Sequence, residues 1–106
     1  DLQHEEFFVL LLNRANEILR TERISVGGMS GTVADGKVIF RSAIEQSAHG
    51  LILIHNHPSG QMQPSDNDKS LTRKMVEFGK YIELPVLDHV IYTDRGYYSF
   101  ADQGLL

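Results

Sequence analysis

The sequence predicts a single α/β domain built on a mixed β-sheet sandwiched by helices. Short apolar runs rich in β-branched and aromatic residues, which are typical of strands, occur at 7–12, 51–54 and 84–93. Two segments with apolar residues at helical spacing lie between these runs, at 35–48 and after Ser65. The expected order is strand, strand, helix, strand, helix, strand, strand, and helices that cover a mixed sheet define an α/β sandwich.

The first half of the chain is expected to form a hairpin followed by a helix. Residues 7–12 are too few for a buried helix, and residues 18–25 alternate well enough to pair with them across a polar turn. Residues 27–32 are expected to form a loop, without the Gly-Lys-Ser/Thr of a phosphate-binding loop. Asp35 is the expected N-cap of the helix at 35–48. The side chains expected on one face of this helix are Phe40, Ala43, Ile44 and Ser47.

The second half begins with the buried strand at 51–54, which Gly50 separates from the helix. A polar loop follows, and the next helix is expected to start at Ser65. Strands are expected at 84–93 and 97–100, joined by a turn. The apolar residues at helical spacing in the second helix are Leu71, Met75, Phe78 and Ile82.

Two histidines lie at the end of the buried strand. His55 and His57 are two residues apart, so on a strand their side chains point the same way from Cα atoms roughly 7 Å apart. Pro58 then ends the strand. Ser65-x-x-Asp68 is typical of a helix start and places the Asp68 carboxylate in the first turn, from which it can reach the histidines. Two imidazoles and one carboxylate, without a fourth ligand in the pattern, predict a catalytic zinc site with a position left for water.

Each half of this pattern also has a simpler explanation. An isolated His-x-His often has no function, and Ser-x-x-Asp is close to an ordinary capping box, worth about 1 kcal/mol. The metal site is favoured because both halves occur within fourteen residues and converge on one edge of the sheet.

The string His55-x-His57-Pro58-x6-Ser65-x-x-Asp68 resembles the JAMM motif of the JAB/MPN metalloprotease fold. With Leu87-Asp88-His89 it resembles the RadC branch of that fold, which carries a DNA-repair name, and the match spans residues 5–106. The resemblance implies one domain over residues 1–106 with the JAB/MPN, cytidine-deaminase-like architecture. It also implies that the two histidines and the aspartate bind zinc, that the serine assists the oxyanion, and that an upstream glutamate is the general base.

The general base must be a carboxylate near the activated water but not bound to the metal. Glu5 and Glu6 precede the first strand, and the register of Glu5-x-Phe7-x-Val9 resembles the RadC pattern with Glu5 in the base position. Glu5 is therefore favoured over Glu6, and the alternative is that both are charges at an exposed strand start. The other candidates by residue type are Glu17, Glu22 and Glu45.

Further polar residues have open roles. Asp88 and His89 are either a structural pair or a pair that orients a metal ligand, since a bound imidazole usually donates its second N–H. Asn56 and Ser59 are expected to satisfy loop and backbone groups. The histidines expected at the surface are His4 and His49.

By resemblance, the expected function is that of a JAMM-type zinc metallopeptidase that hydrolyses a peptide or isopeptide bond with a metal-activated water. Its partner would be a protein or peptide substrate. The alternatives are a nucleic-acid-associated DNA-repair module and a metal-binding domain without peptidase activity. A net charge of -4 and a pI of about 5.6 do not favour a large phosphate-binding face.

Composition is that of an ordinary globular domain, with 42% hydrophobic and 23% charged residues in 106. The absence of cysteine excludes disulfides and thiolate ligands and fits a reducing compartment, so a cytoplasmic location is expected. No apolar run approaches the roughly 20 residues of a membrane span. The first residue is Asp1 rather than Met, which is compatible with a domain excised from a longer protein.

Overall fold

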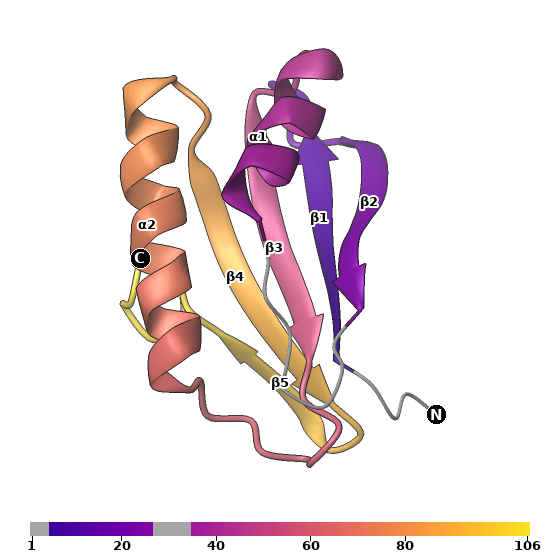
Figure 1. The fold of residues 1–106 in the computed structure, drawn as a ribbon, viewed down its shortest axis with the longest axis vertical. Helices are drawn as coiled ribbons and strands as arrows, with labels where there is room; N and C mark the ends of the chain where they lie inside the picture. The colour runs from indigo at the N-terminus through magenta and orange to yellow at the C-terminus, as the bar shows by residue number, and fades with distance from the viewer. Residues whose placement is uncertain (1–4, 27–34) are drawn as a thin grey trace.

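A computed structural model of the chain describes residues 5–26 and 35–106. The elements in chain order are β1 (Glu6–Leu12), β2 (Ile18–Val26), α1 (Gly36–Glu45), β3 (Gly50–Asn56), α2 (Asp66–Tyr81), β4 (Val86–Thr93) and β5 (Gly96–Ser99). The strands form one sheet in the order β2-β1-β3-β4-β5 (Figure 1). β3 and β4 are parallel and the other neighbours are antiparallel, so the α/β fold class with a mixed sheet is confirmed.

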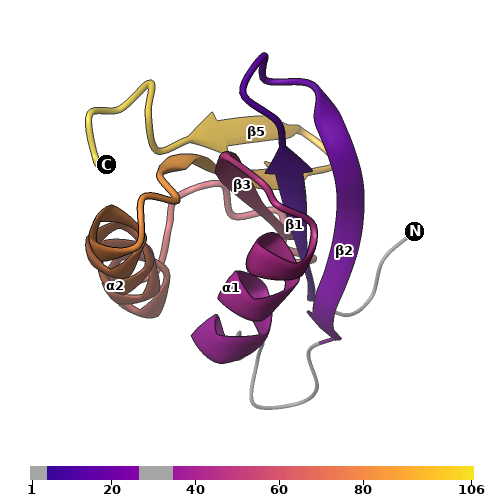
Figure 2. The same ribbon diagram turned by 90° about the horizontal axis from the view of Figure 1, so that it is seen from above.

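Both helices lie on the same side of the sheet (Figure 2). Side chains alternate along a strand, so every second residue of β1 and β3 faces the helices. The residues of β1 on this face are Phe7, Val9 and Leu11, and their partners on β3 are His55, Leu53 and Leu51. In the described part of the chain, the helical layer therefore covers one face of the sheet and not both.

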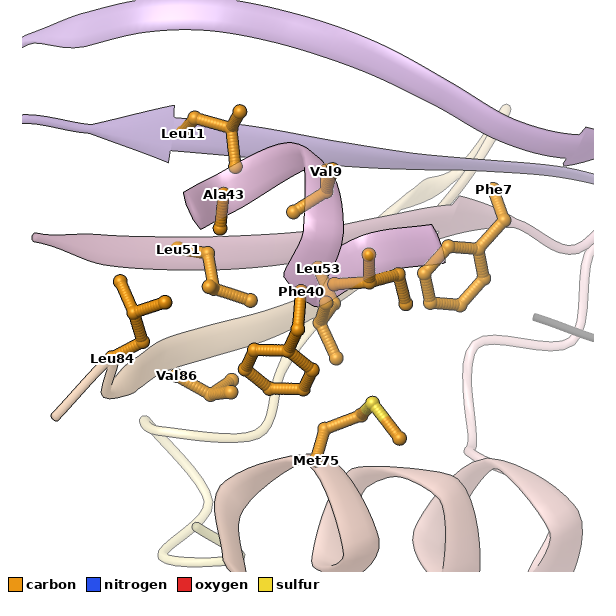
Figure 3. Packing of buried hydrophobic residues seen from close by; sticks show 11 residues of the cluster. Phe7, Val9, Leu11, Phe40, Ala43, Leu51, Leu53, Met75, Leu84 and Val86 are labelled. Carbon is orange, nitrogen blue, oxygen red and sulfur yellow. The ribbon is translucent and has the colours of Figure 1, made fainter. Parts of the chain in front are cut away.

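The hydrophobic core lies between this face and the helices. Figure 3 shows Phe40 and Ala43 of α1 and Met75 of α2 directed toward the inner side chains of β1 and β3. The buried stripe of α1 differs from the expected one, because Ile39 is buried while Ile44 is 62% exposed. Ile44 follows Ala43 by 100° around the helix, in the last turn, where it points away from the sheet.

The segments that flank the candidate ligands are close to those expected. β3 includes His55 and Asn56, and His57 directly after it still donates its backbone N–H to Tyr92 O at 3.1 Å. β4 begins at Val86, two residues later than predicted. Residues 27–32, expected as a loop, and His4, expected at the surface, lie outside the described residues. In the described ranges, neither helix has the length and apolar character needed to cross a membrane.

Gly79 marks the closest approach of α2 to the chain that enters β4. Leu84 donates its backbone N–H to Gly79 O at 2.8 Å, and a Cβ at Gly79 would lie 2.3 Å from Leu84 O. That oxygen belongs to the backbone, so it cannot swing aside as a side chain would. Only glycine fits at this point of the helix without moving the connection.

Gly79→Ala is therefore expected to lower the free energy of unfolding by about 1–3 kcal/mol, the usual cost of overpacking. At an open helical position the same change would raise stability by up to about 1 kcal/mol through helix propensity, so the two effects have opposite signs. Urea denaturation measures the difference, with exposed Lys80→Ala as the control on the same helix. A more stable Gly79→Ala protein would contradict the close packing of α2 on this connection.

Candidate metal centre

The two histidines and the aspartate of the motif meet at one end of the sheet. His55 is the penultimate residue of β3, His57 follows the strand, and Asp68 lies in the first turn of α2. One ligand atom of each residue lies within 4.8 Å of the other two. His55 is buried, while His57 and Asp68 are partly exposed, so the group opens to the surface on the side of the helix.

The separations between the ligand atoms fit a metal ion. His55 Nε2 and His57 Nε2 are 3.0 Å apart, and each lies 3.2 Å from one oxygen of Asp68. In a tetrahedral zinc site with bonds of about 2.0–2.1 Å, ligand atoms are about 3.3 Å from one another. The two nitrogens therefore have the spacing of neighbouring zinc ligands, and each has a carboxylate oxygen at a similar distance, from a different oxygen of Asp68 in each case.

A capping box holds the Asp68 carboxylate in place. Asp68 donates its backbone N–H to Ser65 Oγ at 3.0 Å, and Ser65 donates its backbone N–H to Asp68 Oδ2 at 2.8 Å. Ser65 is thus the N-cap of α2, as expected, and its exposed side chain lies beside the candidate ligands. The carboxylate closes the helix end and faces the imidazoles at the same time.

A turn after the strand orients His57. Gly60 has a φ of 86°, in the left-handed region that glycine adopts most easily, and its N–H bonds to His57 O at 3.0 Å. The turn brings Gln61 O to 2.6 Å from His57 Nδ1. A carbonyl oxygen only accepts, so Nδ1 carries the proton and Nε2 of a neutral His57 is free to bind a metal.

The charges of the site reinforce one another. Burial alone would raise the pKa of Asp68, but hydrogen bonds with His55, His57 and the Ser65 N–H hold it well below its usual range. The hydrogen bond with Asp68 raises the pKa of His57 against the opposing effect of burial, and the negative charge of Glu5 adds to the rise. One carboxylate and two imidazoles at this spacing attract a cation, either a proton or a metal ion.

Asp88 and His89 are paired through the backbone, because the His89 N–H donates to Asp88 Oδ1 at 2.7 Å, but their side chains have different partners. Asp88 accepts hydrogen bonds from Ser99 Oγ at 2.6 Å and from the Ala101 N–H at 2.9 Å, which ties β4 to the turn after β5. His89 Nε2 lies instead 2.9 Å from Nδ1 of His55. His89 alone is therefore in a position to orient a candidate ligand.

Thr72 of α2 is the next partner in this contact, and it was not among the residues predicted from the sequence. Its Oγ1 lies 2.5 Å from His89 Nδ1 and donates to Asp68 O at 2.8 Å. The available signal was its position four residues after Asp68, on the same face of the helix. His89 is fully buried and its ring stacks on Phe100 with centroids 4.6 Å apart. Burial lowers the pKa of His89 to about 3, so this imidazole is neutral at neutral pH.

Glu5 and Glu6 face different surroundings. The negative charge of Glu5 contributes to the raised pKa of His57, after the larger contribution of Asp68. Glu6 adds to the raised pKa of Tyr92, whose main cause is burial. The Glu6 N–H donates to Asn56 Oδ1 at 2.5 Å, which gives Asn56 the backbone-satisfying role expected of it.

The remaining glutamates lie elsewhere. Glu17 accepts a hydrogen bond from Asn13 in the β1–β2 turn, and Glu22 pairs with Arg20 on β2. Glu45 is exposed at the end of α1. Of the five candidates, Glu5 is the one whose charge contributes to the raised pKa of a candidate ligand.

The buried His89 predicts a pH dependence of stability. Its pKa is about 3 in the folded protein and about 6.5 when unfolded, so between these values the unfolded chain binds a proton that the folded chain does not. The free energy of unfolding of metal-free protein should therefore fall on acidification from pH 6.5 to 5, by up to about 1.4 kcal/mol per pH unit. The raised pKa of His57 adds no slope here, because its stabilising effect is complete below about 6.5.

Urea denaturation at several pH values measures this slope, with His89→Phe as the comparison. Phenylalanine keeps an aromatic ring against Phe100 but cannot bind a proton, so its slope over the same range should be smaller. Equal slopes in the two proteins would contradict the assignment of the pH dependence to His89.

Comparison with known proteins identifies the family of the chain. A family model described as RadC-like JAB domain matches residues 1–105. A UPF0758 protein of Flavobacterium johnsoniae is 45% identical over 105 residues, which are 99% of this chain and 46% of that protein. A UPF0758 protein of Chlorobium chlorochromatii is 42% identical over 106 residues, which are 100% of this chain and 48% of that protein. The chain spans about half the length of these curated relatives, and it belongs to the family of RadC-like JAB domains.

Proposed function

We propose that this domain is a zinc-dependent metallopeptidase of the JAMM type, which hydrolyses a peptide or isopeptide bond of a protein or peptide substrate. The observation that supports it most is the triangle of His55 Nε2, His57 Nε2 and the Asp68 carboxylate. The two nitrogens are 3.0 Å apart, and each lies 3.2 Å from a different oxygen of the carboxylate. Three protein ligands with a fourth position open are typical of catalytic zinc, whereas structural zinc sites have four. We also propose a cytoplasmic location, which fits a chain without cysteine.

The residues around the triangle have the chemistry that amide hydrolysis needs. Zinc, when bound, supplies a Lewis acid and lowers the pKa of water to about 7. Glu5, whose charge contributes to the raised pKa of His57, would take the proton of the attacking water and return it to the leaving nitrogen. Ser65 uses an oxygen lone pair for the helix cap, so its hydroxyl proton can be donated to the developing oxyanion of the substrate.

The metal site is tested by zinc binding. We expect one zinc ion per chain, removable by a chelator. Loss of an outer partner of a metal ligand already costs about 10–100-fold in affinity, so His57→Ala, which removes a ligand, should cost more than about 100-fold. Competition with a chromophoric chelator measures the affinities. His49→Ala, at an exposed histidine outside the triangle, is the control. Equal zinc affinities of His57→Ala and the wild type would refute the site.

The role of Glu5 is tested with a matched pair of variants. Glu5→Gln should keep zinc affinity and lose about 10²–10⁴ in rate, the usual contribution of a general base. Glu6→Gln changes the neighbouring carboxylate in the same way but on the side of Tyr92, so it should keep most of the activity. The readout is the appearance of new amino termini in a complex peptide mixture, followed by mass spectrometry with and without chelator. Activity of Glu5→Gln at the wild-type level would exclude Glu5 as the base.

A further inference from the structure

A line of hydrogen bonds leaves the candidate metal centre through the core and returns to α2. His55 Nδ1 lies 2.9 Å from His89 Nε2, and His89 Nδ1 lies 2.5 Å from Thr72 Oγ1. Thr72 Oγ1 then donates to the main-chain oxygen of Asp68 at 2.8 Å. The line thus begins at one candidate ligand and ends on the backbone of another.

The bond from Thr72 to Asp68 O determines which atom is the donor in each of the other hydrogen bonds. A carbonyl oxygen only accepts, so the Thr72 hydroxyl proton points to Asp68 O, and a lone pair of Oγ1 accepts from His89 Nδ1–H. A neutral imidazole has one N–H, so Nε2 of His89 must then accept from Nδ1–H of His55. Nε2 of a neutral His55 then has its lone pair toward His57 and Asp68. A metal ion can take the place of the proton that Nε2 would otherwise donate to Asp68, and this is the form that a metal ligand requires.

If every donor and acceptor along these hydrogen bonds were exchanged, the same nitrogens would be paired, but Nε2 of His55 could not bind a metal. If Thr72 donated to His89, then His89 would donate to His55, and the proton of His55 would lie on Nε2. Both arrangements hold the same number of protons and the same charge, so they differ only in tautomer. The acceptor that the Asp68 carbonyl offers to the Thr72 hydroxyl favours the arrangement that leaves Nε2 of His55 free.

Packing keeps solvent from replacing these bonds. His89 is 0% exposed, Thr72 1% and His55 1%. The His89 ring stacks on Phe100 at an angle of 9° and contacts Phe7 at a centroid distance of 5.8 Å. Its two nitrogens therefore have the partners that the fold gives them, and a buried N–H without an acceptor would be costly.

We propose that Thr72 and His89 are positioning residues for a divalent metal ion, which hold His55 in the Nδ1–H tautomer so that Nε2 can bind the ion. This inference rests on the proposed metal site and deepens it, since it assigns two residues that touch neither the ion nor the substrate. The second histidine achieves the same tautomer differently, because His57 Nδ1 donates to the backbone of Gln61. One ligand thus depends on side chains for its tautomer, and the other does not.

The test is the zinc affinity of two variants of Thr72, measured by calorimetric titration with zinc ions alone. Thr72→Val keeps the shape of the side chain and removes the acceptor for His89, so zinc affinity should fall by about 10–100-fold. Thr72→Ser keeps the hydroxyl and should bind zinc nearly as the wild type does. His89→Phe removes the acceptor of His55 and should lower zinc affinity by a similar factor. It is the replacement test if Thr72→Val does not fold.

A second readout uses the unmodified protein and does not depend on activity. Nitrogen chemical shifts of the histidine rings in zinc-loaded protein should show His89 protonated on Nδ1 and not on Nε2. A proton on Nε2 of His89, or wild-type zinc affinity in folded Thr72→Val, would overturn the inference while the peptidase proposal stands. The expected loss of affinity in Thr72→Val, in a protein that cleaves no peptide, would support the inference and refute the peptidase alone.

Discussion

The carboxylate of Asp68 joins the helical layer to the sheet at the site, and the geometry of the site depends on this contact. One oxygen accepts the Ser65 N–H and so stabilises the first turn of α2. The same carboxylate faces His55 and His57 at the end of β3. A helix N-terminus favours negative charge, so the helix and the imidazoles both stabilise the ionised form. The site therefore forms where the start of α2 and the end of β3 both interact with the carboxylate of Asp68.

Much of the site could be predicted from the sequence because it follows from local rules. Alternation along a strand places His55 and His57 on one side, Pro58 ends the strand, and Ser65-x-x-Asp68 starts a helix. These rules involve residues close in sequence, so they predict which side chains converge. They also predict the α/β class and the order of the elements, since strands and helices of this length have distinct apolar periods.

The sequence could not predict the partner of His55, because that depends on the register between β3 and β4. Leu51 pairs with Val86 and Ile52 with Asp88, so Leu87 is an extra residue in the ladder. Without this irregularity, Asp88 would be opposite Leu53 and would face the core in place of His89. A shift of one residue exchanges the two faces of a strand, and no local pattern in Leu87-Asp88-His89 reveals it. The same dependence on register explains why the sequence alone left Glu5 and Glu6 unresolved.

The two sides of the site differ in how far they can adapt. His55 and its partners His89 and Thr72 lie in the core, where each polar atom needs its neighbour and side chains are closely packed. His57 and Asp68 belong to a turn and to a helix start, and both are partly exposed. Adjustment to an ion or a substrate is therefore easier on the side of the turn and the helix, while the sheet side fixes the position of one ligand. A substitution of His89 or Thr72 would alter the core and the site together, because the hydrogen bonds of these buried residues stabilise both.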